Sequence, residues 1–226
     1  LGNEELIVKW GKSKSSDFAS YNLYGDSSPI PTQKIFTITE IDDTVKTVTG
    51  LTNGTKYYYR LTVSDTSGNS SQFSTEVSET PTSILYVATN GNDGTGDGSE
   101  ASPYATIAKA IDTALENYVV VLKAGTYEEK VDLGGKKITL ASQYLTTNDT
   151  SYISSTILNG SGNGTVVTFN SGEDSTSKLT GFTITNGSSA DGGGIICNGS
   201  SPSLQYLNIT GNSSSNSGGG IYCYNG

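Results

Sequence analysis

The phrase Gly-Gly-Gly-Ile occurs twice near the end of this 226-residue chain, and this repeat constrains the fold more than any other feature. It reads GGGIICNG at 192–199 and GGGIYCYNG at 218–226, a spacing of 26 residues. The segments LTGFTITNG at 179–187 and LQYLNITGN at 204–212 are likewise 25 residues apart. Such a period, built from short strand-forming runs and Gly/Asn/Ser turns without helical signals, predicts one turn of a parallel β-helix per repeat.

Equivalent positions of successive coils are expected to stack about 4.8 Å apart along the axis. Cys197 should therefore point inward and lie beside Cys223. Adjacent coils place the two Cα atoms within disulfide range, but stacked side chains point the same way, which favours buried reduced thiols over a bridge. Gly192 and Gly218 should make the tight turn between faces, where a Cβ would clash or a positive φ is needed.

Composition limits the partners and the chemistry. The net charge is −9 and the only arginine is Arg60, so no basic stripe is present for nucleic acid or an anionic membrane. The chain has no His, which removes the usual general base and the commonest metal ligand. It has no Met, so Leu1 is not expected to be a translation start and the chain is expected to be part of something longer. No apolar run in the sequence is long enough to span a membrane.

Residues 1–80 predict an antiparallel β-sandwich. Tyr57, Tyr59 and Leu61 alternate with Tyr58 and Arg60, which is the period of a half-buried strand. Short alternating strands separated by turn residues are typical of a sandwich. The expected strand regions are 6–10, 21–25, 34–39, 45–50, 56–65 and 71–79.

The stretch LTNGTKYYYRLTV at 51–63 resembles the L-x-x-G-T-x-Y segment of fibronectin type III domains. The resemblance implies that Tyr57 forms the tyrosine corner, with its hydroxyl on backbone, and that Trp10 is the core Trp of the second strand. Only LGNEE precedes the strand that ends in Trp10, so the family's first strand is missing. We expect it to lie upstream or to be donated by a neighbouring chain.

After a linker at 81–83, residues 84–226 form the predicted β-helix domain. A strand at 84–89 leads to a helix with Ser102 as N-cap and Pro103 at its first position. This strand and helix, within 84–117, should cap the coils of 118–226, which are expected to continue beyond the last residue. The apolar face of the helix is predicted to carry Ile107, Ile111, Ala114 and Leu115.

This second domain resembles the opening of right-handed parallel β-helix proteins of the pectate-lyase-like superfamily. YVATNGNDGTGDGSEASPYATIAKAI is similar to their N-terminal entry, and GGGI-x-C-x-N is similar to the repeats of bacterial surface β-helix proteins. The resemblance implies an all-β fold with an N-terminal capping helix. The fold hosts lyases, hydrolases and adhesins alike, so it does not imply one activity.

No catalytic residues are predicted in this segment. Enzymes of the superfamily use clustered carboxylates, or Lys/Arg bases with calcium, and hydrolysis of a glycosidic bond needs two carboxyls that face one gap. Glu173 and Asp174 are sequence neighbours in a loop-like stretch, and such neighbours are more often solvated than catalytic. The acidic loop at 90–100 could bind calcium, with an Asx-rich turn as the alternative. Its oxygen donors are Asn90, Asn92, Asp93, Asp97 and Glu100.

These features predict a non-catalytic structural or adhesive protein, secreted or at the cell surface, that forms part of a longer or fibre-forming protein. Its expected partners are other copies, through the open β-helix end or a donated strand, or extracellular carbohydrate. One alternative is the N-terminal part of a polysaccharide lyase or glycoside hydrolase whose catalytic coils lie beyond residue 226. Another is a passive glycan- or ice-binding solenoid that uses Thr185 and Thr210.

Overall fold

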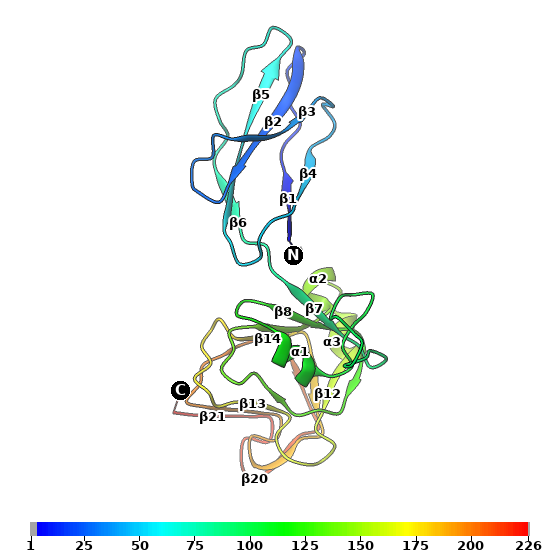
Figure 1. Cartoon of the computed structure of the whole chain (residues 1–226). Helices are drawn as coiled ribbons and strands as arrows, with labels where there is room; N and C mark the ends of the chain where they lie inside the picture. The colour runs from blue at the N-terminus through cyan, green and yellow to red at the C-terminus, as the bar shows by residue number, and fades with distance from the viewer. Residues whose placement is uncertain (1–3, 226) are drawn as a thin grey trace. The chain divides into compact units, whose positions relative to one another are not determined.

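The computed structural model describes residues 4–225 and divides into two compact units, 1–83 and 84–226, which are described here separately. Figure 1 shows the course of the chain through both units. Strands hold 41% of the residues and helices 7%, so the protein belongs to the all-β class. None of the helices in the described part of the chain has both the length and the apolar character needed to cross a membrane.

Unit 1 contains two antiparallel sheets. One has two strands, β1 (Glu5–Lys9) and β4 (Val45–Thr49). The other has four strands, in the order β3 (Lys34–Ile38), β2 (Phe18–Asp26), β5 (Tyr57–Asp65) and β6 (Val77–Glu79).

The two sheets of unit 1 share one apolar core. Tyr21 and Leu23 on β2 are fully buried, and Leu6, Val8 and Trp10 from the other sheet pack against them. The rings of Trp10 and Tyr21 meet edge to face, with centroids 5.5 Å apart. The Tyr21 hydroxyl accepts a hydrogen bond from the Ser13 amide at 2.7 Å and donates one to the Ile41 carbonyl at 3.0 Å, so this buried ring keeps its polar end satisfied.

Unit 2 is a parallel β-helix, because every pairing between its named strands is parallel. Its largest sheet has the order β18 (Ser203–Gln205), β14 (Lys178–Thr180), β11 (Thr139–Ser142), β8 (Val119–Leu122) and β7 (Ile84–Val87). The second contains β19 (Asn208–Ile209), β15 (Thr183–Thr185), β12 (Thr156–Asn159) and β9 (Gly125–Tyr127). The third contains β10 (Val131–Asp132), β13 (Val167–Phe169), β17 (Ile195–Asn198) and β21 (Ile221–Tyr224). A two-stranded sheet joins β16 (Ser188–Asp191) to β20 (Ser213–Ser217).

Successive coils stack in the register that the repeat predicts. Ile184 pairs with Ile209, and Ile195 pairs with Ile221 one coil later. Ile184 and Ile195 are fully buried in the single apolar core of unit 2. The stacking of like side chains therefore builds the core of the solenoid.

Gly192, Gly193 and Gly218 lie where the backbone leaves no room for a side chain. Gly192 has φ of +63° and Gly218 has φ of +64°, a region that strongly favours glycine. A Cβ on Gly192 would lie 2.7 Å from the Ile195 carbonyl oxygen, and a Cβ on Gly193 would lie 2.2 Å from the Ser213 carbonyl oxygen of the next coil. The close contact recurs at Gly218, where a Cβ would lie 2.4 Å from the Ile221 carbonyl oxygen, so backbone crowding accounts for the first glycine of each phrase.

The helix of unit 2 begins later than predicted. Helix α1 spans Ile107–Thr113 with Thr106 as its N-cap, so Ser102 was the wrong cap, and Pro103 precedes the helix. Leu115 lies beyond the helix and is 66% exposed, which makes its predicted place on the buried face wrong as well. Two short helices between β11 and β12 were not predicted: α2 (Tyr144–Thr147) and α3 (Ser151–Ser155).

Candidate functional site

The acidic loop before α1 uses its side chains to bind its own backbone. The side-chain oxygen of Asn92 accepts hydrogen bonds from the Gly94 amide at 2.8 Å and the Thr95 amide at 3.0 Å. Asp93 reaches the start of α1, where Oδ1 accepts from the Ala105 amide at 2.7 Å and Oδ2 accepts from the Thr106 hydroxyl at 2.6 Å. Desolvation raises the pKa of Asp93, but these hydrogen bonds outweigh it and leave the pKa below its ordinary value.

The other predicted calcium ligands are spread along the same loop. Asp97 accepts a hydrogen bond from the Ser99 amide at 2.8 Å, while Asn90 and Glu100 are exposed. Within residues 4–225, no group of three or more Asp, Glu, Cys or His side chains is arranged to hold a metal ion. That finding does not test a site made partly of Asn and backbone oxygens, so calcium binding stays a prediction.

Glu173 is buried and joins three coils of unit 2. Only 2% of the residue is exposed. Its Oε1 accepts from the Gly135 amide of the preceding coil at 2.9 Å. Its Oε2 accepts from the Ser171 amide at 2.9 Å and from the Ser200 hydroxyl of the following coil at 2.8 Å. Desolvation raises the pKa of Glu173, but hydrogen bonds from Ser171, from its own backbone amide, from Gly135 and from Ser200 lower it below the ordinary value.

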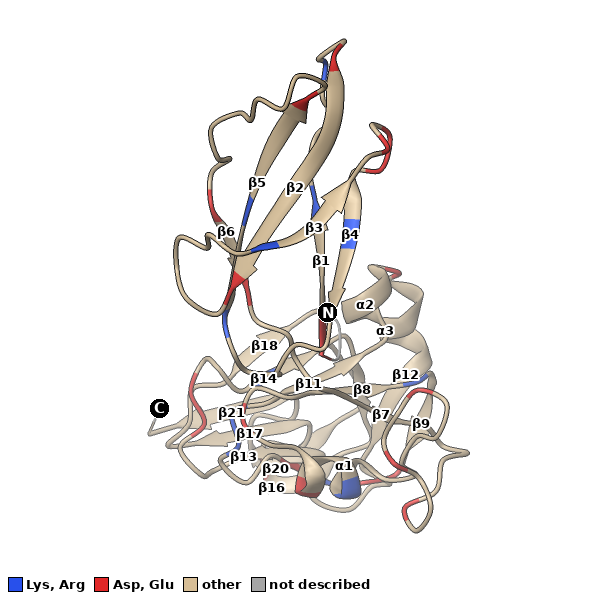
Figure 2. Ribbon diagram, turned by 45° about the horizontal axis from the view of Figure 1, so that its top comes forward, with Lys and Arg blue, Asp and Glu red and all other residues tan. Residues whose placement is uncertain are grey.

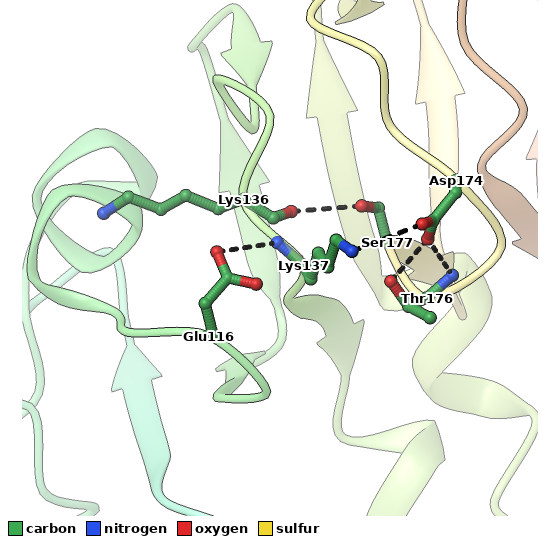
Figure 3. Close-up of polar contacts among 6 residues, drawn as sticks. All are labelled: Glu116, Lys136, Lys137, Asp174, Thr176 and Ser177. Atoms are coloured by element: carbon green, nitrogen blue, oxygen red, sulfur yellow. Dashed lines mark hydrogen bonds and ion pairs between the residues drawn. The ribbon is translucent and has the colours of Figure 1, made fainter.

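Asp174 faces a different environment from its neighbour Glu173, so the two carboxylates form no facing pair. Asp174 is exposed, accepts a hydrogen bond from the Thr176 amide at 2.8 Å and forms an ion pair of 3.5 Å with Lys137 (Figure 3). The Lys137 amide in turn donates to Glu116 at 3.5 Å. Hydrogen bonds from Thr176 lower the pKa of Asp174.

The sequence did not predict that Lys136 binds the carbonyl oxygens at the end of α1. The ammonium group of Lys136 donates to the carbonyl oxygens of Ile111 at 2.6 Å, Asp112 at 2.9 Å and Ala114 at 2.9 Å. These carbonyls lie at the end of the helix, where a cation is favoured. The sequence gives no signal for this contact, because the lysine lies more than twenty residues further along the chain.

The two cysteines are free and differ in environment. Cys197 is buried, and desolvation raises its pKa to about 12. Cys223 pairs with it in register but is exposed, so the expectation of two buried thiols was wrong for Cys223. The physical reason is that β21 is an edge strand of its sheet, with no further coil of the described chain stacked on it.

Of the two aromatic residues predicted to be structural in unit 1, Tyr57 has a hydrogen-bonded polar group and Trp10 does not. The Tyr57 hydroxyl accepts a hydrogen bond from the Thr52 amide at 3.0 Å, five residues earlier. The indole nitrogen of Trp10 is buried and has no hydrogen-bond partner in the described chain. Trp10 therefore contributes through its ring, while Tyr57 also anchors a turn.

A polar trench runs along the corner of unit 2 where β12 and β15 end. Its volume is about 680 Å³. Hydroxyl and amide groups dominate the lining, and Asn186, with φ of +57°, turns the backbone there. Such groups can exchange hydrogen bonds with a polyhydroxylated ligand. The principal lining side chains are Glu128, Asn159, Ser161, Asn186, Ser188 and Ser213.

Charge is spread thinly over the rest of the surface. Figure 2 shows the acidic residues of the described chain on several separate loops, and the positions of Lys and Arg scattered along the ribbon. The lining of the trench is polar and mostly uncharged. Glu128 is the one charged residue among those that line it.

Comparison with known proteins gives limited matches. A family model described as a protein of unknown function (DUF1565) matches residues 89–136. No curated protein matches the sequence. Three similar solved structures are named as an exopolygalacturonase and two pectate lyases.

The family 28 exopolygalacturonase of Yersinia enterocolitica is 16% identical, with a TM-score of 0.33 and coverage of 84% of this chain and 39% of that one. Pectate lyase PelI of Erwinia chrysanthemi is 15% identical, with a TM-score of 0.30 and coverage of 92% and 62%. Pectate lyase Pel3 of Pectobacterium carotovorum is 13% identical, with a TM-score of 0.31 and coverage of 90% and 74%. The chain thus spans less than two thirds of the first two proteins, and its own stacked parallel sheets are what establish the parallel β-helix fold.

Proposed function

We propose that this chain is a non-catalytic structural or adhesive segment of a longer extracellular protein. In this proposal unit 1 is a fibronectin type III-like sandwich without its first strand, and unit 2 is a right-handed β-helix with an N-terminal capping helix. The two antiparallel sheets around one core support the first part. The position of α1 before the first complete coil supports the second.

The observation that carries the proposal is the set of hydrogen bonds that the buried Glu173 makes. This buried carboxylate binds the backbone or hydroxyl groups of three successive coils. A carboxylate held in this way stiffens the stack, and its oxygens are directed into the protein and away from a ligand. Asp93 is likewise engaged at the start of α1. Glu173 and Asp93 therefore serve stability in this chain.

We propose that the adhesive contact is made by the polar trench and that its ligand is a neutral polysaccharide. Hydroxyl and amide groups of Asn159, Ser188 and Ser213 can bond sugar hydroxyls. Glu128 and the net charge of −9 disfavour a polyanionic chain. The trench is therefore expected to prefer an uncharged polysaccharide to an acidic pectic one.

The test measures binding of the 226-residue chain to labelled neutral and acidic polysaccharides, together with the size of the polysaccharide after incubation. We expect retention on a neutral polysaccharide with no shortening of the chains. Ser188→Trp fills the trench and should weaken binding about tenfold or more, whereas Thr126→Trp, an exposed position on β9 outside the trench, should not.

Two outcomes would overturn the proposal. Shortening of either polysaccharide by this chain would favour the alternative of a lyase or hydrolase. Equal binding by the parent and Ser188→Trp would remove the trench as the adhesive site.

A further inference from the structure

Two tyrosine rings meet on the outside of unit 2, at the corner that joins its largest sheet to its second sheet. Tyr144 begins α2, and Tyr206 lies in the turn between β18 and β19. Their ring centroids are 4.7 Å apart, with the ring planes tilted by 52°. Neither ring belongs to the apolar core of unit 2, whereas Leu204 and Leu207, which flank Tyr206, pack against that core. The Tyr206 side chain is therefore directed outward.

A glycine between the two tyrosines allows their rings to meet. The Gly181 amide donates to the Gln205 carbonyl of the following coil at 3.2 Å, so Gly181 lies on the coil between those of Tyr144 and Tyr206. A Cβ on Gly181 would lie 2.5 Å from the Ser142 hydroxyl oxygen and 3.2 Å from the Tyr144 Cβ. A side chain at this position would crowd the base of Tyr144. The ring contact is thus set by three successive coils within the described chain.

Tyr206 has a backbone conformation that disfavours its side chain. Its φ is +51°, and the equivalent residue of the preceding coil is Gly181, with φ of +84°. A bulky side chain is rare in this region, which glycine adopts without penalty. Backbone strain of this kind clusters at active sites, ligand clamps and switch regions. Tyr206 thus keeps its ring at a cost that glycine would avoid.

An uncharged amide side chain follows the chain into each ring. Gln143 precedes Tyr144, and Gln205 precedes Tyr206. The Gln143 side chain makes no hydrogen bond within residues 4–225, and the Gln205 amide donates only to the Ser203 hydroxyl, at 3.2 Å. Aromatic rings next to amides suit a pyranose, whose C–H face packs on a ring and whose hydroxyls bond an amide. The net charge of −9 disfavours nucleic acid and acidic sugars.

We propose that Tyr144 and Tyr206 form an aromatic platform that stacks on the sugar rings of a neutral polysaccharide, with Gln143 and Gln205 as hydrogen-bonding partners. Tyr206 is 59% exposed, so its ring keeps surface for a ligand while it packs on Tyr144. The aromatic platform is separate from the trench, because it lies ahead of β12 and β19 along the chain, whereas the trench lies where β12 and β15 end. It rests on the proposed function only for the class of its ligand.

The first experiment titrates the 226-residue chain with four neutral polysaccharides: a glucan, a galactan, a mannan and a xylan. Retention of the protein measures binding. A shift of the tyrosine absorption band in the ultraviolet difference spectrum reports contact of a sugar with a tyrosine ring. We expect at least one of the four polysaccharides to bind and to shift the band.

Substitutions at Tyr206 separate the role of the ring from that of the fold. Tyr206→Gly removes the ring and suits the positive φ, so it should fold, weaken binding about tenfold or more and abolish the band shift. Tyr206→Phe keeps the ring and should bind within about threefold of the parent. Tyr58→Ala, at a half-buried tyrosine of unit 1, is the control and should change neither readout. Circular dichroism confirms that each variant is folded.

Ser188→Trp separates the aromatic platform from the trench. This variant should weaken retention through the trench and leave the tyrosine band shift in place. If Ser188→Trp alone loses binding, and Tyr206→Gly binds and shifts as the parent does, the aromatic platform is overturned and the trench stands. If Tyr206→Gly alone loses binding, the trench is overturned and the aromatic platform stands.

Three further outcomes would overturn the aromatic platform. A parent that binds none of the four polysaccharides would remove the trench as well. Binding equally weak in Tyr206→Phe and Tyr206→Gly would show that the hydroxyl, and not the ring, makes the contact. A band shift caused by choline, with none caused by a polysaccharide, would assign the two rings to a cation.

Discussion

A Cβ atom at Gly192 would meet two obstacles, a positive φ and a carbonyl oxygen at 2.7 Å. Gly199 offers a matched control, since its φ is also +63° but the nearest atom to a Cβ is 3.9 Å away. We expect Gly199→Ala to lower the free energy of unfolding by about 1 kcal/mol from the backbone term alone. Gly192→Ala should cost about 3 kcal/mol, because crowding adds to that term.

Urea denaturation followed by far-ultraviolet circular dichroism measures both variants. Equal losses of stability would show that the close contact at Gly192 has no energetic weight.

The repeat in the sequence predicts where these glycines lie, since a period of 26 residues aligns Gly192 with Gly218. It does not predict Glu173 as a link between coils, because Gly135 and Ser200 lie 38 and 27 residues from it in irregular turns.

At the scale of single elements, α1 begins where the carboxylate of Asp93 binds the N-cap residue and the residue before it. Asp93 accepts hydrogen bonds from Ala105 and Thr106, and the Thr106 hydroxyl accepts from the Lys109 amide at 3.1 Å. Asp93→Ala should lower the free energy of unfolding of the 226-residue chain by about 1–2 kcal/mol, as loss of a helix cap does. Asp97→Ala, which removes an exposed turn contact, should have a much smaller effect.

Thermal melting with and without a chelator separates this capping role from calcium binding. If Asp93 acts as a cap, its substitution lowers the melting temperature equally in both conditions. If the loop binds calcium, millimolar calcium raises the melting temperature of the parent and not that of Asp93→Ala. An unchanged melting temperature for Asp93→Ala in the chelator would contradict the capping role.

The start of α1 also shows where local sequence rules failed. Ser102 followed by Pro103 is a strong local helix-start pattern. The structure instead places Ser102 in a turn, with its amide bonded to the Ser99 carbonyl at 3.2 Å. The helix starts at Ile107 because Asp93 and Glu129 satisfy the amides there, and both lie far from the helix start in sequence. Contacts of this range are invisible to a local pattern.

At the scale of the whole molecule, the period of the hydrophobic repeat predicts the parallel β-helix, because regular coils impose a regular spacing. The sequence does not predict the helices α2 and α3, which interrupt an early coil between β11 and β12. An insertion at a corner leaves the sheets in register, as the pairing of Thr139 with Lys178 shows, while it lengthens the coil in sequence. Periodicity is therefore informative in the last coils and weak in the first ones.

The dependence of stability on pH follows from the carboxylates of the whole chain. Hydrogen bonds that stabilise the charged form lower the pKa of several carboxyl groups in the folded protein. These are Asp65, Asp93, Asp97, Asp149, Glu173 and Asp174. A pKa that is lower in the folded than in the unfolded state contributes stability above the unfolded value, and this contribution is lost as the pH falls through the folded value.

We therefore expect the urea midpoint to be constant between about pH 6 and pH 7.5, since the chain has no His to titrate there, and to fall below about pH 4.5. Glu173→Gln should lower stability at neutral pH by about 2 kcal/mol, because it removes a charged acceptor from buried hydrogen bonds. It should also make the acid loss shallower. Asp174→Asn, at an exposed carboxylate, is the control and should change neutral stability little. A urea midpoint that moves between pH 6 and pH 7.5 would contradict this account, since the stabilising carboxylates titrate only at lower pH. So would an unchanged loss of stability in acid for Glu173→Gln, since Glu173 is the one buried residue among these carboxylates.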